Sequence, residues 1–248
     1  MPPARQTLSK SRVTRAGETV RRWFLGEPAL PSDDEFVDAV GVLVAWRQAH
    51  AYPLSLVTPG VRKWVSQEIE PFSPVVVAQR LKRLDRMVEK LGRLRTIRLA
   101  QMEDIAGCRA VVHDPAEVEA VARRIYRKWD VRAVNDYREV GNPKTGYRGL
   151  HVIVLRRERR VEIQLRTIDQ NNWAELVERT SSRTRYNLKD GEGPADLIEY
   201  LRVASDIIWE YENGREASDE LTSRMKELRR TAGHYFHPGS TTRRQREG

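Results

Sequence analysis

In the run Arg159–Thr167 (RRVEIQLRT), apolar and polar side chains alternate strictly from Val161 onward. Side chains alternate between the two faces of a β-strand, so this pattern is typical of a strand. Its apolar members, Val161, Ile163 and Leu165, share one face, and its polar members, Glu162, Gln164 and Arg166, share the other. Three hydrogen-bonding side chains on one face of a strand deep in the chain require a polar environment. The run therefore predicts a strand that borders a polar cavity.

Three further β-rich runs accompany this strand. Gly149–Arg156 (GLHVIVLR) holds four consecutive apolar residues and indicates a strand that is buried on both faces. Cys108–His113 and Asp130–Tyr137 also read as strands, and a helical pattern, Pro115–Trp129, separates them. This order predicts an α/β (α+β) domain with a small, mixed, curved β-sheet that is flanked by helices.

Helical spacing of apolar residues marks the remaining segments. Asp33–His50 has this spacing and an acidic first turn. The segment from Ser73 to Leu94 predicts a second helix, which begins at Ser73-Pro74 and carries an apolar stripe of Val77, Leu81, Leu84, Val88 and Leu91. Cations occupy much of the rest of its surface. The helical patterns at 169–180 and 194–214 are expected to close the domain.

The formal net charge of +9 is concentrated at the two ends of the chain. Residues 1–30 hold six Lys/Arg against two acids, residues 224–248 hold seven against two, and the rest is balanced. We therefore expect a basic N-terminal segment (1–30), one domain (31–220) and a basic C-terminal segment (221–248) that is helical or disordered. Basic ends fit a polyanionic partner, because neutralised phosphates release counterions. Solubilising, disordered tails are the alternative.

Several classes of protein are disfavoured. The sequence has no GxxxxGK[ST] loop, no GxGxxG motif between a strand and a helix, no HExxH motif and no Cys/His cluster. Its single cysteine, Cys108, sits among apolar residues and is expected to be a buried, inert thiol. No stretch approaches the roughly 20 apolar residues that span a bilayer, and no signal-peptide pattern is visible. A cytoplasmic protein without membrane contact is expected.

Other residues of matching chemistry suggest a nucleotide site. Asp104 and Glu162 lie beside predicted strands, and His151 begins another. Carboxylates brought together from different strands suit Mg²⁺, which usually takes one or two protein carboxylates together with substrate phosphates. The loop Asn142–His151 (NPKTGYRGLH), called here the 142–151 loop, places the aromatic ring of Tyr147 among cations and glycines. This composition predicts a loop that feeds a buried strand next to a polar cavity.

Four stretches, in order and spacing, resemble the synthetase domain of the RelA/SpoT family, which includes small alarmone synthetases and their toxic relatives. RLKRLDRMVEKLGR (80–93) resembles the basic helix of the family, and EDIAGCRAVV (103–112) its metal-binding strand. DYREVGNPKTGYRGLHVIV (136–154) resembles its acceptor loop, and VEIQLRTIDQNNWAE (161–175) its second acidic strand. The resemblance covers about residues 70–215. It implies a nucleotidyltransferase-like fold and Mg²⁺-dependent transfer of the β,γ-diphosphate of ATP to a ribose 3′-hydroxyl, with release of AMP.

The resemblance also implies roles for particular residues. The catalytic residues would be Asp104, Tyr147 and Glu162; Asp104 and Glu162 would hold Mg²⁺, and Glu162 would also take the proton of the attacking hydroxyl. ATP would be bound by Arg80, Lys82, Arg86, Lys90, Arg93 and Arg109, with Arg80 and Arg109 on the two faces of the adenine. The acceptor would be bound by Lys144, Tyr147, Arg148, His151, Gln164 and Asn171, with its base stacked on Tyr147.

The sequence departs from the family at two places. Arg86 stands where members commonly have serine, and WAELVERTSS (173–182) lacks the Glu-His pair that usually follows the Trp-Ala motif. The added cation either binds phosphate or disturbs the ATP pocket. The missing pair removes a histidine that the family uses.

Three functions remain open. The basic ends favour a toxin-type enzyme, which modifies the 3′-terminal adenosine of tRNA and so blocks aminoacylation. The first alternative is an alarmone synthetase with GDP or GTP as acceptor, and the second is a catalytically inactive RNA-binding module. A neutralising antitoxin protein and a homo-oligomer are further partners that the resemblance implies.

Overall fold

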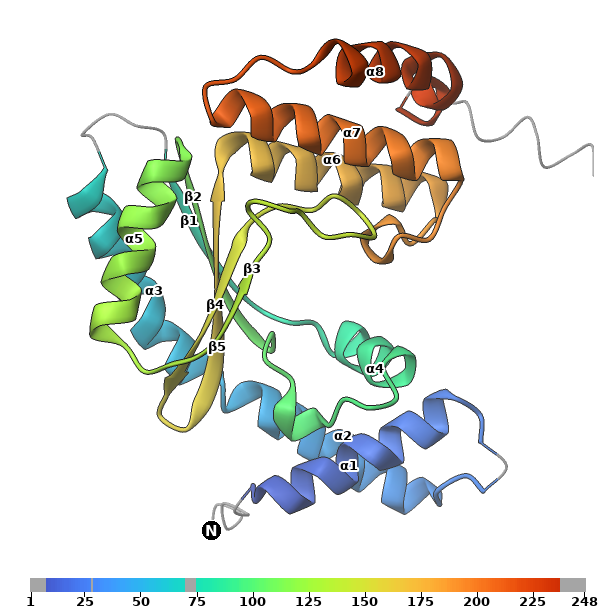
Figure 1. Ribbon diagram of the computed structural model, residues 1–248. Helices are drawn as coiled ribbons and strands as arrows, with labels where there is room; N and C mark the ends of the chain where they lie inside the picture. Colours follow the sequence, from blue (N-terminus) through green and yellow to red (C-terminus); the bar gives the residue numbers. More distant parts are fainter. Residues whose placement is uncertain (1–7, 28, 70–74, 237–248) are drawn as a thin grey trace, which may run out of the picture.

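The computed structural model describes residues 8–27, 29–69 and 75–236. A five-stranded sheet lies at its centre, with helices on both sides (Figure 1). The strands are β1 (Val76–Leu81), β2 (Ala106–Val112), β3 (Val131–Asp136), β4 (Leu150–Arg156) and β5 (Arg159–Thr167), in the spatial order β1-β2-β5-β4-β3. Strands β2 and β5 are parallel, whereas the other neighbours are antiparallel. The predicted α/β fold with a small mixed sheet is confirmed.

Eight α-helices surround the sheet in the described part of the chain. They are α1 (Lys10–Phe24), α2 (Asp33–Gln48), α3 (Ala51–Glu68), α4 (Leu84–Arg93), α5 (Pro115–Lys128), α6 (Ile168–Thr184), α7 (Ala195–Glu212) and α8 (Asp219–Ala232). Short 3₁₀ turns lie at η1 (Leu99–Gln101), η2 (Leu188–Asp190) and η3 (Gly233–Phe236). The predicted helices α2, α5, α6 and α7 are confirmed. Ser32 begins α2 with a capping box, in which its hydroxyl and the Glu35 carboxylate accept each other's backbone N–H.

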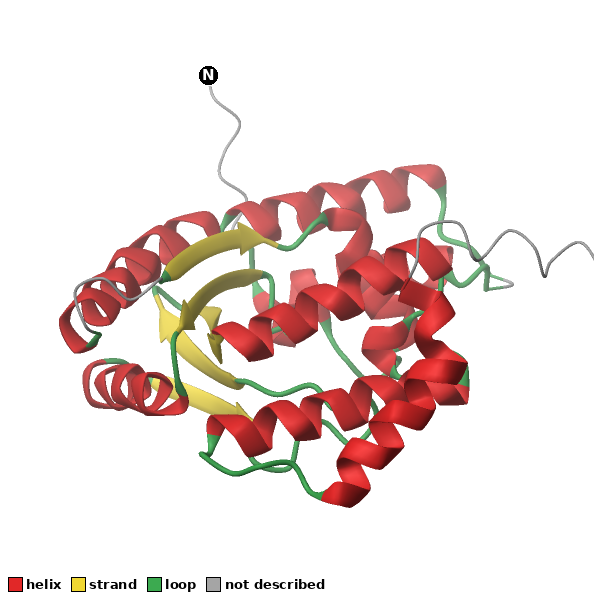
Figure 2. Cartoon of the chain, turned by 90° about the horizontal axis from the view of Figure 1, so that it is seen from above, coloured by secondary structure: helices red, strands yellow, loops and turns green. Residues whose placement is uncertain are grey.

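The alternation in β5 determines how the two faces of the sheet differ. Its apolar residues are fully buried in a core that α3 and α5 share with the sheet. Figure 1 shows these two helices on one side of the sheet, whereas α4 and α6 lie on the other. The polar residues of β5 therefore face the space between the α4 and α6 sides of the molecule. Figure 2 shows the sheet from above, with the helices arranged around it.

The predicted long helix that starts at Ser73-Pro74 is wrong for residues 76–81, which form β1; residues 70–74 lie outside the described part. Val76 to Leu81 pair antiparallel with β2. Val77 and Leu81 pack against the core, whereas Val76, which precedes them, is exposed. Three consecutive β-branched residues, Val75 to Val77, favour a strand, and the edge of β2 offers this segment hydrogen-bonding partners. Together these two effects outweigh the helical spacing of its apolar residues. The helix begins only at Leu84.

Two helices were not predicted, α1 and α3. Helix α3 contains Pro59, and such a residue normally argues against a helix interior. Helix α1 lies in the basic N-terminal segment, yet it packs with α2, α4 and η1 around a second core. Arg21 shows that this basic segment belongs to the fold. Its guanidinium is buried and donates to the Leu91 carbonyl at 2.7 Å and to the Ile97 carbonyl.

A third core joins α6, α7 and η2, and α8 packs on α7. Both terminal helices, α1 and α8, contact the rest of the fold. The predicted domain boundaries at residues 30 and 220 stay predictions. None of the helices in the described part of the chain combines the length and apolar content needed to cross a bilayer.

Candidate functional site

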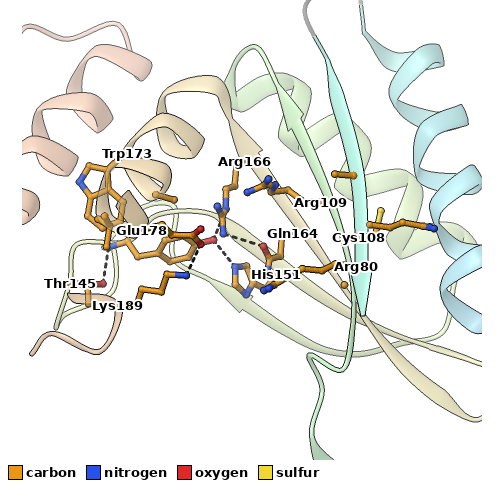
Figure 3. A pocket seen from close by; sticks show the side chains of 16 residues that line it. Arg80, Cys108, Arg109, Thr145, His151, Gln164, Arg166, Trp173, Glu178 and Lys189 are labelled. Atoms are coloured by element: carbon orange, nitrogen blue, oxygen red, sulfur yellow. Dashed lines mark hydrogen bonds and ion pairs between the residues drawn. The ribbon is translucent and has the colours of Figure 1, made fainter. Parts of the chain in front are cut away.

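A cavity of about 490 Å³ opens on the polar face of the sheet (Figure 3). Strands β1, β2, β4 and β5 form its floor, and the 142–151 loop, α6 and η2 form its walls. Five of the predicted site residues line it: Arg80, Arg109, Tyr147, His151 and Gln164. They come from four separate segments of the sequence, so the fold alone brings them together.

Strand register explains this convergence. Arg109 on β2 lies opposite Gln164 on β5, which in turn lies opposite His151 on β4. The neighbouring row on the same face holds Arg80 and Glu162, with Gly107 between them. A Cβ atom added at Gly107 would meet nothing within 4 Å, so this glycine leaves open space beside the two side chains. A planar ligand can therefore approach the sheet there.

A series of hydrogen bonds connects Tyr147 to Glu162. The Tyr147 hydroxyl lies 2.6 Å from Nε2 of His151, and Nδ1 of His151 lies 3.0 Å from Oε1 of Glu162. Gln164 donates from Nε2 to Oε2 of Glu162 at 2.6 Å, and Arg166 donates from Nε to the Tyr147 hydroxyl at 2.9 Å. Each polar group in this series has a partner, which fixes the orientation of the Glu162 carboxylate.

Electrostatics keep these groups in defined protonation states. Burial raises the pKa of the Glu162 carboxyl, but the hydrogen bond and charge of His151, together with Gln164, lower it further than burial raises it. The net shift is downward, so Glu162 is an anion at neutral pH. Burial raises the pKa of Tyr147, whose hydroxyl therefore keeps its proton.

The 142–151 loop holds Tyr147 in place through its own backbone. Gly146 has φ of +79°, and an added Cβ would lie 2.9 Å from Cα of Arg202 on α7. The Ser205 hydroxyl donates to the Gly146 carbonyl at 2.6 Å. Gly149 has φ of +152°, and an added Cβ would lie 2.6 Å from the Tyr147 hydroxyl. Glycine is needed at both positions, because only it allows this backbone and these close approaches.

Two cations of this loop do not line the cavity. The Arg148 side chain is buried and donates to the carbonyls of Arg138, at 2.7 Å, and of Glu139, as well as to Asp206 at 2.7 Å. These contacts attach the start of the loop to α7. Lys144 is exposed and lies next to Gly191. The acceptor-phosphate roles of both residues stay predictions.

Asp104 and two lysines form a second group near the cavity. The Oδ2 atom of Asp104 accepts from Nζ of Lys82 and from Nζ of Lys90, each at 2.9 Å. Burial raises the pKa of Asp104, but the charges of Lys90 and Lys82 outweigh it and make the net shift downward. Its Oδ1 atom is buried and has no hydrogen-bond partner among the described residues.

The remaining predicted ATP ligands are also ion-paired. Arg93, at the end of α4, pairs with Asp190 of η2, so the α4 and α6 sides meet through this contact. Arg86 pairs with Glu89 on the exposed surface of α4, and its side chain is 62% exposed. Neither residue lines the cavity. Their roles in ATP binding stay predictions.

Asn171 is placed differently from the expectation that it meets the acceptor base in the cavity. Its side chain is buried on α6, and Nδ2 donates to Oε1 of Glu175 at 2.9 Å. Its Oδ1 atom is buried without a partner in the described structure. The residue does not line the cavity, although α6 contributes the neighbouring Trp173.

Sequence reasoning missed other lining residues, among them Thr145, Glu178 and Lys189. Glu178 on α6 and Lys189 on η2 form an ion pair with Nζ and Oε1 2.5 Å apart. Helical spacing from Trp173 identifies the apolar face of α6 that contains Ala174 and Val177, and this face also lines the cavity. No pattern in the sequence marks Lys189, because η2 is a short irregular turn.

Within the described residues, no group of three or more His, Cys, Asp or Glu side chains is arranged to hold a metal ion. Asp104 and Glu162 are close enough that the charge of Asp104 affects the pKa of Glu162. Two carboxylates, one of them with an unpartnered buried oxygen, fit Mg²⁺, which takes few protein ligands when phosphates supply the rest.

Comparison with known proteins agrees with this geometry. Residues 79–189 match the family described as a region found in RelA/SpoT proteins. Uncharacterized proteins of Mycobacterium tuberculosis and Mycobacterium bovis are 33% identical over 157 residues, which is 58% of this chain and 55% of those proteins. The chain thus spans about half the length of the curated relatives that it matches.

Two solved structures share the fold. One is the small alarmone synthetase 1 of Bacillus subtilis bound to its product pppGpp, with 21% identity, coverage of 76% of this chain and 97% of that one, and a TM-score of 0.53. The other is a GTP pyrophosphokinase family protein of Streptococcus pneumoniae, with 19% identity, coverage of 75% and 96%, and a TM-score of 0.55. Residues 79–189, which match the family model, contain nearly all of the cavity floor and most of the cavity walls. Residues 79–189 therefore correspond to the region found in RelA/SpoT proteins, and the chain shares the fold of these two structures.

Proposed function

We propose that the cavity is the active site of a pyrophosphokinase, which transfers the β,γ-diphosphate of ATP to the 3′-hydroxyl of a ribose. The hydrogen-bonded series Tyr147–His151–Glu162 carries the proposal, because it holds an oriented anion directly behind two residues that line the cavity, Tyr147 and His151. A fixed carboxylate beside bound phosphates can accept a hydroxyl proton.

In the proposed reaction, the ribose 3′-oxygen forms a bond to the β-phosphorus of ATP. The bond from that phosphorus to the oxygen shared with the α-phosphate breaks, and AMP leaves. The hydroxyl proton passes to Glu162. Such displacements depend mainly on positioning and on the neutralisation of charge.

The cavity offers two cations for the adenine of ATP. Arg80 and Arg109 come from neighbouring strands and sit on diagonal positions of the same face, beside the open space at Gly107. A planar guanidinium stacks well on a base. We assign them to the two faces of the adenine.

Lys82, Lys90 and Arg93 are assigned to the triphosphate. Their present partners are Asp104 and Asp190, and phosphate oxygens would compete with these carboxylates for the same donors. Mg²⁺ held by Asp104 and Glu162 would neutralise charge on the transferred phosphates. The exposed Arg86 is assigned to the outer end of this series.

Two acceptors remain proposals, the 3′-terminal adenosine of tRNA and the guanine nucleotides GDP and GTP. The basic ends of the chain favour tRNA. In the described structure, Arg21 and Arg22 of α1 pair with Glu18 and Glu27, and Arg224 of α8 pairs with Glu199. Glu18 and Glu27 are already counted in the surplus of the N-terminal segment, whereas Glu199 lies outside the C-terminal segment and offsets one positive charge there. A neutralising protein partner and a homo-oligomer also stay predictions.

A direct test is diphosphate transfer from γ-labelled ATP in the presence of Mg²⁺, with deacylated tRNA, GDP and GTP offered separately. Labelled acceptor and an equal amount of AMP are expected with one of them. Steep inhibition by salt would accompany the tRNA reaction, because phosphate contacts release counterions. The alternative, a catalytically inactive RNA-binding module, predicts that wild type transfers no label to any acceptor. It also predicts that Asp104→Ala and Glu162→Ala bind RNA as wild type does.

A further inference from the structure

Helix α6 presents one face to the cavity and another to a groove that the proposed function does not use. The groove consists of two hollows of about 600 and 370 Å³, which adjoin because Leu176 of α6 and Phe236 of η3 line both. Figure 1 shows α6, α7 and α8 packed together, and η3 follows α8. We call this surface the α6–η3 groove, and its main lining residues are Leu176, Arg179, Arg183, Tyr200, Arg229 and Phe236.

The floor of the α6–η3 groove is apolar. Leu176, Tyr200 and Phe236 are partly buried and pack against the core that α6 and α7 share. The rings of Tyr200 and Phe236 contact each other, with centroids 4.8 Å apart. Hollows with such a floor suit the aliphatic or aromatic side chains of a protein partner.

Arginines stand on both sides of this floor. Arg179 and Arg183 are exposed at positions i and i+4 of α6, and Arg229 is exposed on α8. Arg183 donates to the Phe236 carbonyl at 3.1 Å, and none of the three arginines forms an ion pair with a described carboxylate. The one acid in the described lining, Glu178, is already bound by a lysine of η2. The groove is therefore positively charged.

The lack of carboxylates in the groove contrasts with the surface beside it. Arg224, on the same helix as Arg229, is paired with Glu199 and with Glu227. The negative end of a helix dipole favours cations in the last turn, which fits two of the three groove arginines but not Arg179, inside α6. Like charges four residues apart on a helix repel each other. The pair on α6 thus gains nothing from the fold that would explain it.

We propose that the α6–η3 groove binds an acidic amphipathic helix of a protein partner. The apolar side chains of this helix fill the two hollows, and its carboxylates pair with the arginines on either side. The inference does not depend on the proposed function, because of the residues that line the groove only Glu178 also lines the cavity.

Other occupants fit the α6–η3 groove less well. Residues 237–248 of the chain hold three arginines and one glutamate, so the groove arginines repel them. A nucleic acid matches the charge of the groove, but bases stack on open aromatic faces. Tyr200 and Phe236 instead pack against each other.

The test is the fluorescence anisotropy of labelled helical peptides mixed with the full chain. Two acidic peptides of about 15 residues carry leucines at i, i+3 and i+7, or at i, i+4 and i+7, with glutamates beside them. For each peptide, a scrambled version of the same composition lacks the apolar face, and a version with lysine for glutamate reverses the charge. Wild type should bind at least one acidic peptide about tenfold more tightly than either counterpart.

Reversing the charge of the pair on α6 tests the assigned surface. Arg179→Glu/Arg183→Glu should weaken binding of the acidic peptide by about tenfold or more, because attraction becomes repulsion. Salt should weaken binding to wild type more than to this variant. Arg123→Glu/Arg127→Glu is the matched control, since these arginines are also exposed at i and i+4, on α5, and line neither hollow. It should bind the peptide as wild type does, and thermal unfolding checks that both variants are folded.

Three results would overturn the proposal. One is equal binding of the acidic peptides and their counterparts by wild type, or undiminished binding by Arg179→Glu/Arg183→Glu. Another is tighter binding of oligouridine than of the peptides, with the same dependence on the two arginines, which would assign the groove to nucleic acid. The third is a dimer of the chain in sedimentation that Arg179→Glu/Arg183→Glu dissociates, because a second copy would then occupy the groove.

Discussion

The Nδ1 atom of His151 lies 3.0 Å from Oε1 of Glu162, on the strand next to it in the sheet. A carboxylate only accepts, so Nδ1 carries the proton of this hydrogen bond. The opposite nitrogen, Nε2, lies 2.6 Å from the Tyr147 hydroxyl. His151 thus connects the loop that would hold the acceptor with the carboxylate that would receive its proton.

Replacing His151 tests this connection. His151→Gln should lower kcat by about a hundredfold, the lower range for removing part of an acid–base system. His151 is the main influence that lowers the pKa of Glu162, so its loss raises that pKa. The acid limb of the kcat–pH profile should therefore move to higher pH in the variant. A profile with an unmoved acid limb would show that Glu162 is not the titrating base.

The ring and the hydroxyl of Tyr147 have separable roles. Tyr147→Ala removes the stacking platform, whose contribution is about 1–3 kcal/mol per base, and should lower transfer by at least about 5- to 150-fold. Tyr147→Phe keeps the ring and loses the bonds to His151 and Arg166, so kcat should fall about tenfold with little change in the KM for the acceptor. Initial rates at varied acceptor concentration measure both. Full activity of Tyr147→Ala would contradict the assignment of the loop.

Alanine substitutions at Gly149 and Gly107 should have opposite effects on the stability of the fold. Gly149→Ala would strain the backbone and place Cβ 2.6 Å from the Tyr147 hydroxyl, which should lower stability by about 1–3 kcal/mol and reduce transfer. Gly107→Ala meets no neighbour within 4 Å and replaces a strand glycine, so stability should rise by about 0.5–1 kcal/mol. Its added methyl group should nevertheless raise the KM for ATP. Thermal unfolding and ATP titrations check the pair, and equal behaviour of both variants would refute this description of the cavity floor.

The charge of Asp104 should affect both the transfer reaction and the stability of the fold at acid pH. Its pKa in the folded chain is lowered, so the carboxylate stabilises the fold above its unfolded pKa of about 3.9. That contribution is lost as pH falls through the lower, folded value. Asp104→Asn should therefore flatten the dependence of the urea midpoint on pH below about 4, and should lower transfer by about 10²- to 10³-fold. Parallel pH curves for wild type and variant would contradict the paired state of Asp104.

The sequence predicted the part of the fold in which local pattern and tertiary role agree. Strand β5 has the predicted bounds because its alternation reflects one buried and one polar face. The segment 76–81 was predicted as a helix, since its apolar residues also fit a helical stripe and the free edge of β2 is invisible in the sequence. Helix α3 escaped prediction because Pro59 interrupts the usual signal.

Prediction of the site residues from the sequence has the same limit, because contacts between distant segments are not visible in the sequence. Tyr147, His151 and Gln164 were identified through motifs, and strand register brings them to one cavity. Lys189 was missed because a short turn after α6 carries it to the cavity. Arg148 resembles a phosphate ligand in sequence, but its burial against two carbonyls and Asp206 depends on contacts between distant segments. Residue type predicted the chemistry of the site, whereas the partner of each cation required the structure.

The central claim is tested most directly by following γ-labelled ATP with wild type and Glu162→Gln in the presence of Mg²⁺ and the acceptor panel. We predict label on a ribose 3′-position of an acceptor, one AMP released for each label transferred, and loss of both products in the variant. Release of ADP or inorganic phosphate without labelled acceptor, or undiminished transfer by Glu162→Gln, would contradict the proposed pyrophosphokinase.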